Sequence, residues 1–326
     1  MNWGILGCAS IAVNSVIPAI LRTENQNLIS ISSRSKEKGI YIANKYSCDL
    51  EIGYQNLINR TDINAVYIPL PNSMHYKWVK AALLTGKHVL VEKPAVTSFE
   101  QAQELVAIAQ KNNLALVENF QFQTHSQNKW VTDKLKNNEL GELRNFRSTF
   151  CFPKFGELDN IRYNRDLKGG ALFDAGAYVL KAVSVILKGK LKVLSSNIID
   201  NTDFDIDWYG DISGFDMKNN LPCQLTFGFD NYYQCNYEIL GSKGKITVLR
   251  AFTAKADFKP SVIFERNGVR ETIVLANDDH FKNMIQYFEK LVSKNDFEDE
   301  REEILNQALL MDEVRRLRFY PKKTKL

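Results

Sequence analysis

Over residues 1–120, short apolar runs alternate with amphipathic segments of helical periodicity. The runs are apolar on both faces, as strands are when helices cover both sides of a parallel sheet. This alternation predicts an α/β fold with a doubly wound parallel sheet. The predicted strands are residues 2–7, 28–33, 63–70, 87–94 and 114–120, and the predicted helices are residues 11–23, 36–46, 75–86 and 98–113.

The pattern changes after residue 120, where strands follow one another with turn residues between them and few helices intervene. Such a pattern is typical of a mostly antiparallel sheet in an α+β domain. We therefore predict two domains, 1–120 and 121–326. The predicted strands of the second domain are residues 143–152, 192–200, 207–217, 222–230, 232–242 and 244–250, and its predicted helices are residues 127–136, 279–291 and 304–317.

The composition narrows the functional classes. The chain has no run of ~18 apolar residues, and it opens on a predicted strand where a secretory signal would lie. The net charge of +4 is small and the basic residues are dispersed, so neither nucleic acid nor a membrane is an expected partner. The five cysteines are far apart and lack the spacing of a zinc site. We therefore expect a reduced, cytoplasmic protein without a metal.

The turn after the first predicted strand has nearly the spacing of a dinucleotide-binding motif. Gly7 takes the first position of G-x-G-x-x-G/A, Ala9 replaces the second glycine and Ala12 takes the third position. In such a turn, backbone N–H groups approach the cofactor phosphates at the start of a helix. Similar turns occur in α/β proteins that bind no nucleotide, so both interpretations stay open. The candidate phosphate-binding residues are Gly7, Cys8, Ala9, Ser10 and Ile11.

The end of the second predicted strand indicates which nicotinamide cofactor is preferred. NAD-preferring sites have an acidic residue here, which accepts hydrogen bonds from the ribose hydroxyls and would repel a 2′-phosphate. This chain has Ser33 and Arg34, with Lys38 following, and a hydroxyl with a guanidinium can bind that phosphate. The alternative is that Arg34 is a solvated loop residue. We expect NADP(H) as the favoured cofactor, with NAD(H) as the alternative.

Two further loops follow the third and fourth predicted strands. Ligands of open α/β sheets bind outside the carboxyl ends of the strands, so both loops are expected to face the cofactor. The stretch HVLVEKPAV, residues 88–96, runs from an apolar strand directly into an acid, a base and a proline. The candidate cofactor contacts in these loops are Pro69, Leu70, Asn72, His75, Glu92 and Lys93.

The stretch AVYIPLPNSMHYKWVKAALLTGKHVLVEKP, residues 65–94, resembles the Gfo/Idh/MocA family, and so does RYNRDLKGGALFDAGAY at 162–178. The resemblance covers essentially the whole chain. It implies a Rossmann domain for the cofactor in 1–120. For 121–326 it implies an open antiparallel sheet for substrate binding and for a homodimer or homotetramer. It also implies oxidation or reduction of sugars or polyols, a catalytic role for Lys93 and a cis peptide bond before Pro94.

The chemistry supports this role for Lys93. Hydride transfer between a carbinol carbon and nicotinamide requires a proton to leave or join the oxygen. A partly desolvated lysine beside a cationic ring has a lowered pKa and can exchange that proton. Glu92 could orient the lysine. The alternative is that Glu92 and Lys93 are a solvated surface pair at a strand end.

The second motif departs from the family's pattern. Many members have D-x-G-x-H-x-x-D at the start of a long helix, with the histidine as acid or base. Here Asp174 is the first aspartate, Tyr178 takes the histidine position and Lys181 takes the last position. A tyrosine is a poor base at neutral pH but a good donor to a developing alkoxide, which favours carbonyl reduction. It resembles the tyrosine of glucose–fructose oxidoreductase, dihydrodiol dehydrogenases and nucleotide-sugar 3-ketoreductases; a core aromatic is the alternative.

Other polar residues are candidates for binding a substrate. Gln121, His125 and Gln127 follow the fifth predicted strand, although a helix-start role for His125 is an equal alternative. Arg162 and Arg165 precede a Gly-Gly turn and could clamp a phosphate or lie in a solvated loop. The substrate candidates are Gln121, His125, Arg162, Arg165, Asp174, which could instead orient the helix, and Tyr178.

These features give three hypotheses for the function. The first is an NADP(H)-dependent reductase of a sugar keto group, with a nucleotide-linked sugar as the expected substrate, in which Lys93 and Tyr178 donate the proton and stabilise the oxyanion. The second is a dehydrogenase of a free polyol or sugar. The third is a nucleotide-binding protein without turnover, and the presence of both Lys93 and Tyr178 counts against it.

Overall fold

The computed structural model describes residues 1–157 and 159–319. The chain folds into two compact units. The first unit comprises Met1–Gln121 and Phe281–Ala308, so a late segment of the chain returns to it. The second unit comprises Phe122–His280 and the chain from Leu309 onward. None of the helices in the described ranges is long and apolar enough to cross a membrane.

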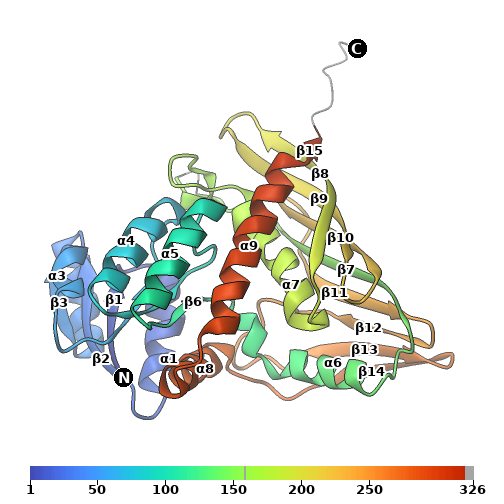
Figure 1. Cartoon of the computed structure of the whole chain (residues 1–326), viewed down its shortest axis with the longest axis horizontal. Coiled ribbons are helices and arrows are strands. Elements are labelled where there is room, and N and C mark those ends of the chain that lie inside the picture. The colour runs from blue at the N-terminus through green and yellow to red at the C-terminus, as the bar shows by residue number, and fades with distance from the viewer. Residues whose placement is uncertain (158, 320–326) are drawn as a thin grey trace. The chain divides into compact units, whose positions relative to one another are not determined.

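The first unit is built on a parallel sheet, whose described strands number six and follow the order β3-β2-β1-β4-β5-β6. In Figure 1 the helices α4 (Asn72–Leu84) and α5 (Phe99–Lys111) lie next to each other in front of this sheet. The chain fills one half of the sheet from β1 outward and then the other half from β4 outward. The strand order therefore reverses between the central strands β1 and β4, and ligands bind at such a switch point. The predicted doubly wound α/β fold is therefore confirmed. The strands are β1 (Asn2–Leu6), β2 (Asn27–Ser33), β3 (Asp49–Ile52), β4 (Ala65–Ile68), β5 (His88–Val91) and β6 (Leu116–Glu118).

Helices cover both faces of this sheet. They are α1 (Ile17–Leu21), α2 (Lys36–Tyr46), α3 (Tyr54–Ile58), α4 (Asn72–Leu84), α5 (Phe99–Lys111), α8 (His280–Lys294) and the first part of α9 (Glu298–Arg316). On β4, Val66 and Ile68 belong to a core with α3, α4 and α5, whereas Ala65 and Tyr67 belong to a core with α1, α2 and α8. Burial on both faces explains why these strands are continuous apolar runs.

Two elements of this unit are absent from the predicted pattern. β3 is a four-residue strand at the edge of the sheet, and its Asp49 and Glu51 break any apolar run. α3 has five residues, too few for helical periodicity to show. The predicted strand 63–70 is also too long, because β4 ends before Pro69, whose ring nitrogen cannot donate to a neighbouring strand.

The second unit contains a sheet of nine described strands in the order β14-β13-β12-β11-β7-β10-β9-β8-β15. The pairs β7/β10 and β8/β15 are parallel, and the remaining neighbours pair antiparallel, which confirms the predicted mostly antiparallel sheet. The strands are β7 (Leu143–Phe152), β8 (Leu191–Asn201), β9 (Ile206–Asp216), β10 (Leu221–Phe229), β11 (Gln234–Gly241), β12 (Gly244–Val248), β13 (Ser261–Arg266), β14 (Val269–Val274) and β15 (Arg318–Phe319).

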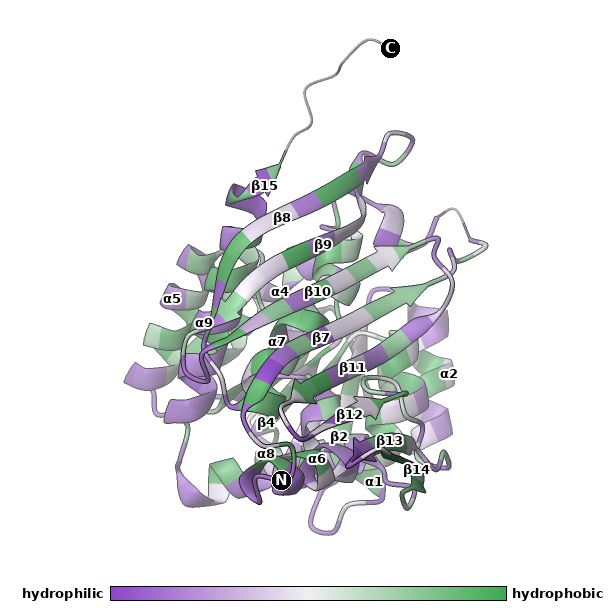
Figure 2. Ribbon diagram, turned by 90° about the vertical axis from the view of Figure 1, so that its right-hand side faces the viewer, coloured by the Kyte–Doolittle hydropathy of each residue, from purple (hydrophilic) through white to green (hydrophobic). Residues whose placement is uncertain are grey.

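One face of this sheet is covered and the other is open. α7 (Ala177–Leu187) is buried along its whole length and contacts β7, β8 and β10, while α6 (Ser126–Lys136) packs beside α7. The opposite face carries exposed polar side chains such as Asn197, Asp211 and Thr226. Figure 2 shows the strands of this face with no helix in front of them. The predicted open sheet is therefore confirmed.

The hairpin of β13 and β14 is also absent from the predicted elements, although the sequence contains its turn signal. The two strands are joined by Asn267 and Gly268, whose φ angles of 53° and 76° are the positive values of a type I′ turn. The side chains of β14 are exposed at nearly every position, so the strand shows no apolar alternation. An Asn-Gly pair was the available evidence for a hairpin here.

Asp207 on β9 gives a prediction for the pH dependence of stability. Its carboxylate accepts a hydrogen bond from the Leu172 N–H, and burial raises its pKa to about 6. The folded-state pKa is above the ordinary value of a carboxyl. The contribution of Asp207 to the free energy of unfolding is therefore fully present below about pH 4 and is lost as the pH rises through about 6. The free energy of unfolding of Asp207→Asn minus that of the wild type should therefore be higher at about pH 8 than at about pH 5. Between these two pH values the change in this difference in the free energy of unfolding, measured by calorimetry, should be about 1.4 kcal/mol.

Asp211→Asn is the matched control for this substitution. Asp211 lies on the same strand with its side chain on the open face of the sheet. Its replacement should leave the pH dependence of melting unchanged. Equal destabilisation by Asp207→Asn at both pH values would contradict the prediction, because it would mean that the folded protein does not disfavour the ionised carboxylate.

Candidate functional site

The turn after β1 leaves backbone N–H groups available to an anion. Gly7 has a φ angle of 109°, which favours glycine, and its N–H donates to Ser32 O at 3.0 Å. A Cβ on Gly7 would lie 3.0 Å from Leu70 Cδ2, so a side chain would fill the space above the turn. The following helix starts at Ser10, and the π-helical turn Ala12–Val16 within it has no side-chain cap. Residues 7–11 therefore have the backbone geometry that a phosphate requires.

The end of β2 lies next to this turn. The Ser33 hydroxyl donates to Ser35 O at 2.7 Å and accepts from Ser35 N–H at 3.1 Å, which shapes the chain as it enters α2. Arg34 and Lys38 are exposed. Burial raises the pKa of the Cys8 thiol, and a hydrogen bond with Ser33 and the charge of Lys38 partly offset this shift. The structure thus places the residues predicted to bind a 2′-phosphate, Ser33, Arg34 and Lys38, next to the turn after β1.

Tyr54, which no sequence motif singles out, faces the same turn. Its hydroxyl lies 3.8 Å from the position that a Cβ on Gly7 would take. Burial raises the pKa of the Tyr54 phenol, and the Arg34 guanidinium nearby partly offsets this shift. Trp78 packs edge-on against the Tyr54 ring, with 5.1 Å between the centroids. Because α3 gives no periodic signal, the sequence pattern offered no means of finding this residue.

The turn after β5 carries Lys93 between anchored residues. The peptide bond between Lys93 and Pro94 is cis, as the family resemblance implies. Glu92 Oε1 accepts hydrogen bonds from the Tyr67 hydroxyl and from Asn119 Nδ2, both at 2.6 Å. Burial raises the pKa of Glu92, and the two donors with the charge of Lys93 partly offset this shift. Glu92 therefore fixes the backbone from which the lysine side chain extends.

The residues after the lysine are anchored as well. Pro94 O lies 2.8 Å from His75 Nδ1, and Ala95 N–H donates to Glu118 Oε1 at 2.7 Å. His75 is fully buried, and its Nε2 lies 2.7 Å from Leu70 O. Both ring nitrogens of His75 therefore face backbone carbonyl oxygens within the first unit. The sequence predicts His75 as a cofactor contact. In the structure its ring contacts the backbone of the loops after β4 and β5.

The loop after β4 stands at the same edge of the sheet, since β4 and β5 pair in parallel. Pro69 and Leu70 are buried, and Asn72 is the half-buried first residue of α4. No side chain caps α4. The loops after β1, β4 and β5 thus lie at the carboxyl ends of neighbouring strands, where a dinucleotide binds in sheets of this order.

In the second unit, Tyr178 is the second residue of α7. A π-helical turn, Leu172–Gly176, leads into this helix. The Tyr178 ring packs against the rings of Phe122, Phe150 and Phe252, with centroid distances of 5.9, 5.3 and 5.5 Å. Only 7% of the residue's surface is exposed. Aromatic packing therefore holds the ring in place, and the removal of its hydroxyl would leave that packing intact.

Arg162 and Asp174 form an ion pair in the same unit, with Arg162 Nε 2.5 Å from Asp174 Oδ2. Asp174, with a smaller contribution from Tyr178, raises the pKa of Arg162. Asp174 also lies one helical turn before Tyr178, so the ion pair and the tyrosine are neighbours. Arg165 is not part of this group, because it pairs with Asp205 at the exposed surface.

The polar residues after β6 have structural partners. His125 is the N-cap of α6, and its Nδ1 accepts a hydrogen bond from Gln127 N–H at 3.1 Å. Gln127 Nε2 donates to Arg250 O at 3.0 Å, and Gln121 is buried. His280 lies edge-on to His125 with 5.7 Å between ring centroids, and burial lowers the pKa of His280 to about 4. His125 thus stands at a helix start, the alternative that its sequence position left open.

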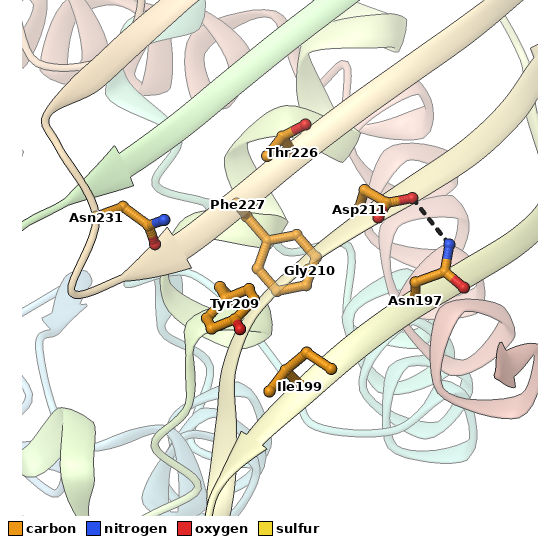
Figure 3. A pocket seen from close by; sticks show the side chains of 8 residues that line it. All are labelled: Asn197, Ile199, Tyr209, Gly210, Asp211, Thr226, Phe227 and Asn231. Atoms are coloured by element: carbon orange, nitrogen blue, oxygen red, sulfur yellow. Dashed lines mark hydrogen bonds between the residues drawn. The ribbon is translucent and has the colours of Figure 1, made fainter. Parts of the chain in front are cut away.

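Two further features bear on the choice of site. No group of three His, Cys, Asp or Glu side chains in the described part of the chain is arranged to hold a metal ion. A cavity of about 170 Å³ lies on β8, β9 and β10, where Asn197 Nδ2 donates to Asp211 Oδ2 at 3.1 Å (Figure 3). These two side chains are on the open face of the sheet, opposite α7, so the cavity does not include Tyr178.

Comparison with known proteins gives matches along most of the chain. A family model described as an oxidoreductase family with an NAD-binding Rossmann fold matches residues 1–120. A second model, the Gfo/Idh/MocA C-terminal domain, matches residues 129–247.

Individual relatives match nearly the full length. The dTDP-3,4-didehydro-2,6-dideoxy-alpha-D-glucose 3-reductase of Actinomadura kijaniata is 36% identical over 96% of this chain and 94% of its own length. The protein of the same description from Saccharopolyspora spinosa is 36% identical over 87% of this chain and 85% of its own. The crystal structure of a 3-ketoreductase from Actinomadura kijaniata, in complex with NADP and TDP-benzene, has a TM-score of 0.93 at 34% identity and covers 98% of each chain.

Proposed function

Because the chain belongs to the Gfo/Idh/MocA family of oxidoreductases, we propose that it reduces a keto group of a nucleotide-linked sugar with NADP(H). The observation that carries this proposal is the turn after β5, where anchored neighbours hold Lys93 at the carboxyl edge of a parallel sheet. The two curated relatives are dTDP-sugar 3-reductases, and the crystallised one binds NADP and TDP-benzene. These likenesses support a nucleotide-linked ketosugar as the substrate class.

The residues at this edge fit a dinucleotide. The backbone N–H groups of residues 8–11 would hold its phosphates, with Gly7 leaving space for them, and Ser33 with Arg34 would hold a 2′-phosphate. When bound, the nicotinamide supplies the hydride that the carbonyl carbon receives. No carboxylate occupies residues 33–36, where an NAD-preferring site has one. The space left open by the absent side chain of Gly7 fits the phosphates of a dinucleotide, and the exposed Arg34 supports NADP(H) as the cofactor.

We assign the proton chemistry to Lys93 and Tyr178. As the carbonyl carbon is reduced, its oxygen gains negative charge and needs a proton. The Lys93 ammonium can give that proton from Nζ, and the Tyr178 hydroxyl can donate a hydrogen bond to the same oxygen. Arg162 lies close enough to Tyr178 for their charges to interact, and its ion pair with Asp174 holds it there while offsetting its positive charge. The two donors come from different units, and the assignment to one reaction rests on their chemistry.

Assays with the purified protein and NADPH test the substrate class. We expect NADPH to be consumed with a dTDP-linked 3-ketosugar and not with the same ketosugar lacking its nucleotide. Oxidation of free polyols and sugars with NADP⁺ is measured in parallel. Turnover confined to those free substrates would favour the polyol dehydrogenase. Tight NADPH binding without turnover of any of them would favour a protein that binds the nucleotide without catalysis.

Arg34→Ala tests the cofactor assignment. The substitution is expected to raise KM for NADPH roughly tenfold to hundredfold, because a charge-assisted hydrogen bond contributes about 1.5–3 kcal/mol. KM for NADH should change by less than about threefold, since NADH has no 2′-phosphate. Lys45→Ala, at the far end of α2, is the control and should change neither value. An equal rise in both KM values would show that Arg34 does not bind the 2′-phosphate.

We also propose that the open face of the nine-stranded sheet joins copies of the chain into a homodimer or homotetramer. This face exposes Leu194, Ile199 and Tyr209, apolar surface that an interface would bury. Sedimentation of the purified protein at several concentrations tests the proposal, and a monomer at all of them would contradict it. The free state of Cys8, Cys48, Cys151, Cys223 and Cys235 supports a reducing, cytoplasmic location.

A further inference from the structure

His75 stands between two loops at the carboxyl edge of the parallel sheet. It belongs to the first turn of α4 and is fully buried. Its Nδ1 lies 2.8 Å from Pro94 O, directly after the catalytic candidate Lys93. Its Nε2 lies 2.7 Å from Leu70 O, in the loop after β4. Each distance is short enough for a hydrogen bond, so one side chain lies against both loops. Both partners are acceptors, so a neutral ring donates to one of them at a time and only the doubly protonated ring donates to both.

The Leu70 end of this link reaches the phosphate-binding turn. The Leu70 side chain lies over Gly7, where a Cβ would come within 3.0 Å of Leu70 Cδ2. Movement of the loop after β4 would therefore change the space above the turn in which we place the cofactor phosphates. The Pro94 end of the link reaches the backbone that carries Lys93. His75 thus contacts one loop that serves the cofactor and one that serves the proton donor.

The other anchors of the catalytic turn hold the residues on either side of the lysine. Glu92, held by Tyr67 and Asn119, fixes the residue before it. Glu118 holds the Ala95 N–H, two residues after it. The two contacts of His75 differ from these because they lead to separate loops, one after β5 and one after β4. The loss of each contact should therefore have its own kinetic consequence.

We propose that His75 is a positioning residue whose Nδ1–H places the Lys93 turn for catalysis, while its Nε2 side places the Leu70 loop for cofactor binding. The inference rests on the proposed catalytic role of Lys93. The carbonyl of Pro94 is an acceptor only, so the bond that positions the lysine requires a donor at Nδ1. A substitution that keeps a donor at one nitrogen's position and not at the other's separates the two effects.

Asparagine and glutamine provide that separation. The His75→Asn amide can take the place of Nδ1 and reach Pro94 O, whereas the longer His75→Gln amide can take the place of Nε2 and reach Leu70 O. We expect His75→Gln to lower kcat roughly tenfold to hundredfold, because a small displacement of a catalytic group has effects of that size. His75→Asn should keep kcat within about threefold of the wild type and raise KM for NADPH several-fold.

His88→Gln is the control for a half-buried histidine with a structural role, because the longer amide does not replace Nδ1. His88 starts β5 at the end opposite Lys93, and its Nδ1 accepts a hydrogen bond from Ala115 N–H at 3.0 Å. This variant should lower the melting temperature and leave kcat and KM unchanged for the folded protein. Equal losses of kcat in His75→Asn and His75→Gln, or unchanged kinetics in both with lower melting temperatures, would overturn the proposal for His75.

Lys93→Met, measured in the same assays, separates this inference from the proposed function. If Lys93→Met is inactive and both His75 variants behave as the wild type, the lysine is catalytic and His75 does not position it. If Lys93→Met is fully active, the proposed role of the lysine fails, and the positioning role of His75 fails with it. A loss of kcat in Lys93→Met and His75→Gln, but not in His75→Asn, is the result that supports both.

Discussion

Lys93→Met is expected to lower kcat for ketosugar reduction by roughly two to four orders of magnitude, the usual contribution of a positioned acid or base. Methionine keeps the apolar stem of the side chain but has no proton to give. Glu92, Pro94 and Ala95 are anchored through their own atoms, so the backbone of the turn should keep its place. Steady-state assays give kcat, and quenching of protein fluorescence by NADPH gives a dissociation constant that should change by less than about tenfold.

Lys87→Met is the matched control, because Lys87 directly precedes β5 and lies at the opposite end of this strand from Lys93. Lys87 Nζ donates to Arg60 O at 2.6 Å and to Ile63 O at 2.7 Å. Its loss leaves two carbonyl groups without their donor, which should lower the melting temperature while kcat of the folded protein stays near the wild-type value. A wild-type kcat in Lys93→Met would remove the lysine from the mechanism and leave the proposed reaction without its proton donor.

The parallel sheet could be predicted because of how its strands are buried. Strands such as β4 and β5 lie between helices on both faces, so every position favours an apolar residue and the run stands out from the helices around it. The edge strand β3 has no such requirement, and its charged residues hide it. The same holds for β14, whose side chains are mostly exposed. Prediction therefore depended on burial and not on position in the sheet, since β6 is also an edge strand but is buried at every position and was predicted.

The turn that carries Lys93 could be predicted as a motif, but the side chains that anchor it could not. The family resemblance, which the matches confirm, implied the importance of Lys93 and the cis bond before Pro94. Tyr67 and Asn119 bond to Glu92 from 25 and 27 residues away, because β4 and β6 flank β5 in the sheet. Such contacts depend on strand order and not on spacing along the chain. The roles of the individual site residues remain predictions.

The environment of the tyrosine shows the same limit. Arg162 lies in the second stretch that resembles the family, residues 162–178. It pairs with Asp174 because the chain turns back between them at Gly169 and Gly170. The sequence spacing of twelve residues gives no indication of this contact. The sequence indicated that Arg162 and Arg165 could clamp a phosphate. In the structure Arg165 instead forms an ion pair with Asp205 at the exposed surface.

Tyr178→Phe is expected to lower kcat by roughly two orders of magnitude, the usual effect of removing one hydrogen-bond donor to a developing oxyanion. The substitution deletes only the hydroxyl, and the ring keeps its contacts with Phe122, Phe150 and Phe252. The melting temperature and the dissociation constant of NADPH should therefore stay near their wild-type values. Thermal melts, NADPH titration and steady-state kinetics on one preparation measure all three quantities.

Tyr237→Phe is the matched control, since Tyr237 is a buried tyrosine of the same unit whose hydroxyl donates to Asn128 Oδ1 at 2.8 Å. Its loss should lower stability and leave kcat unchanged, the reverse of the pattern expected for Tyr178→Phe. A fully active Tyr178→Phe would make Tyr178 a core aromatic only. Unchanged kcat with weaker NADPH binding would instead give its hydroxyl a role in holding the cofactor. Loss of kcat alone would mean that Tyr178, which stands where many family members have a histidine, donates a hydrogen bond to the reacting oxygen. That result would favour carbonyl reduction over alcohol oxidation.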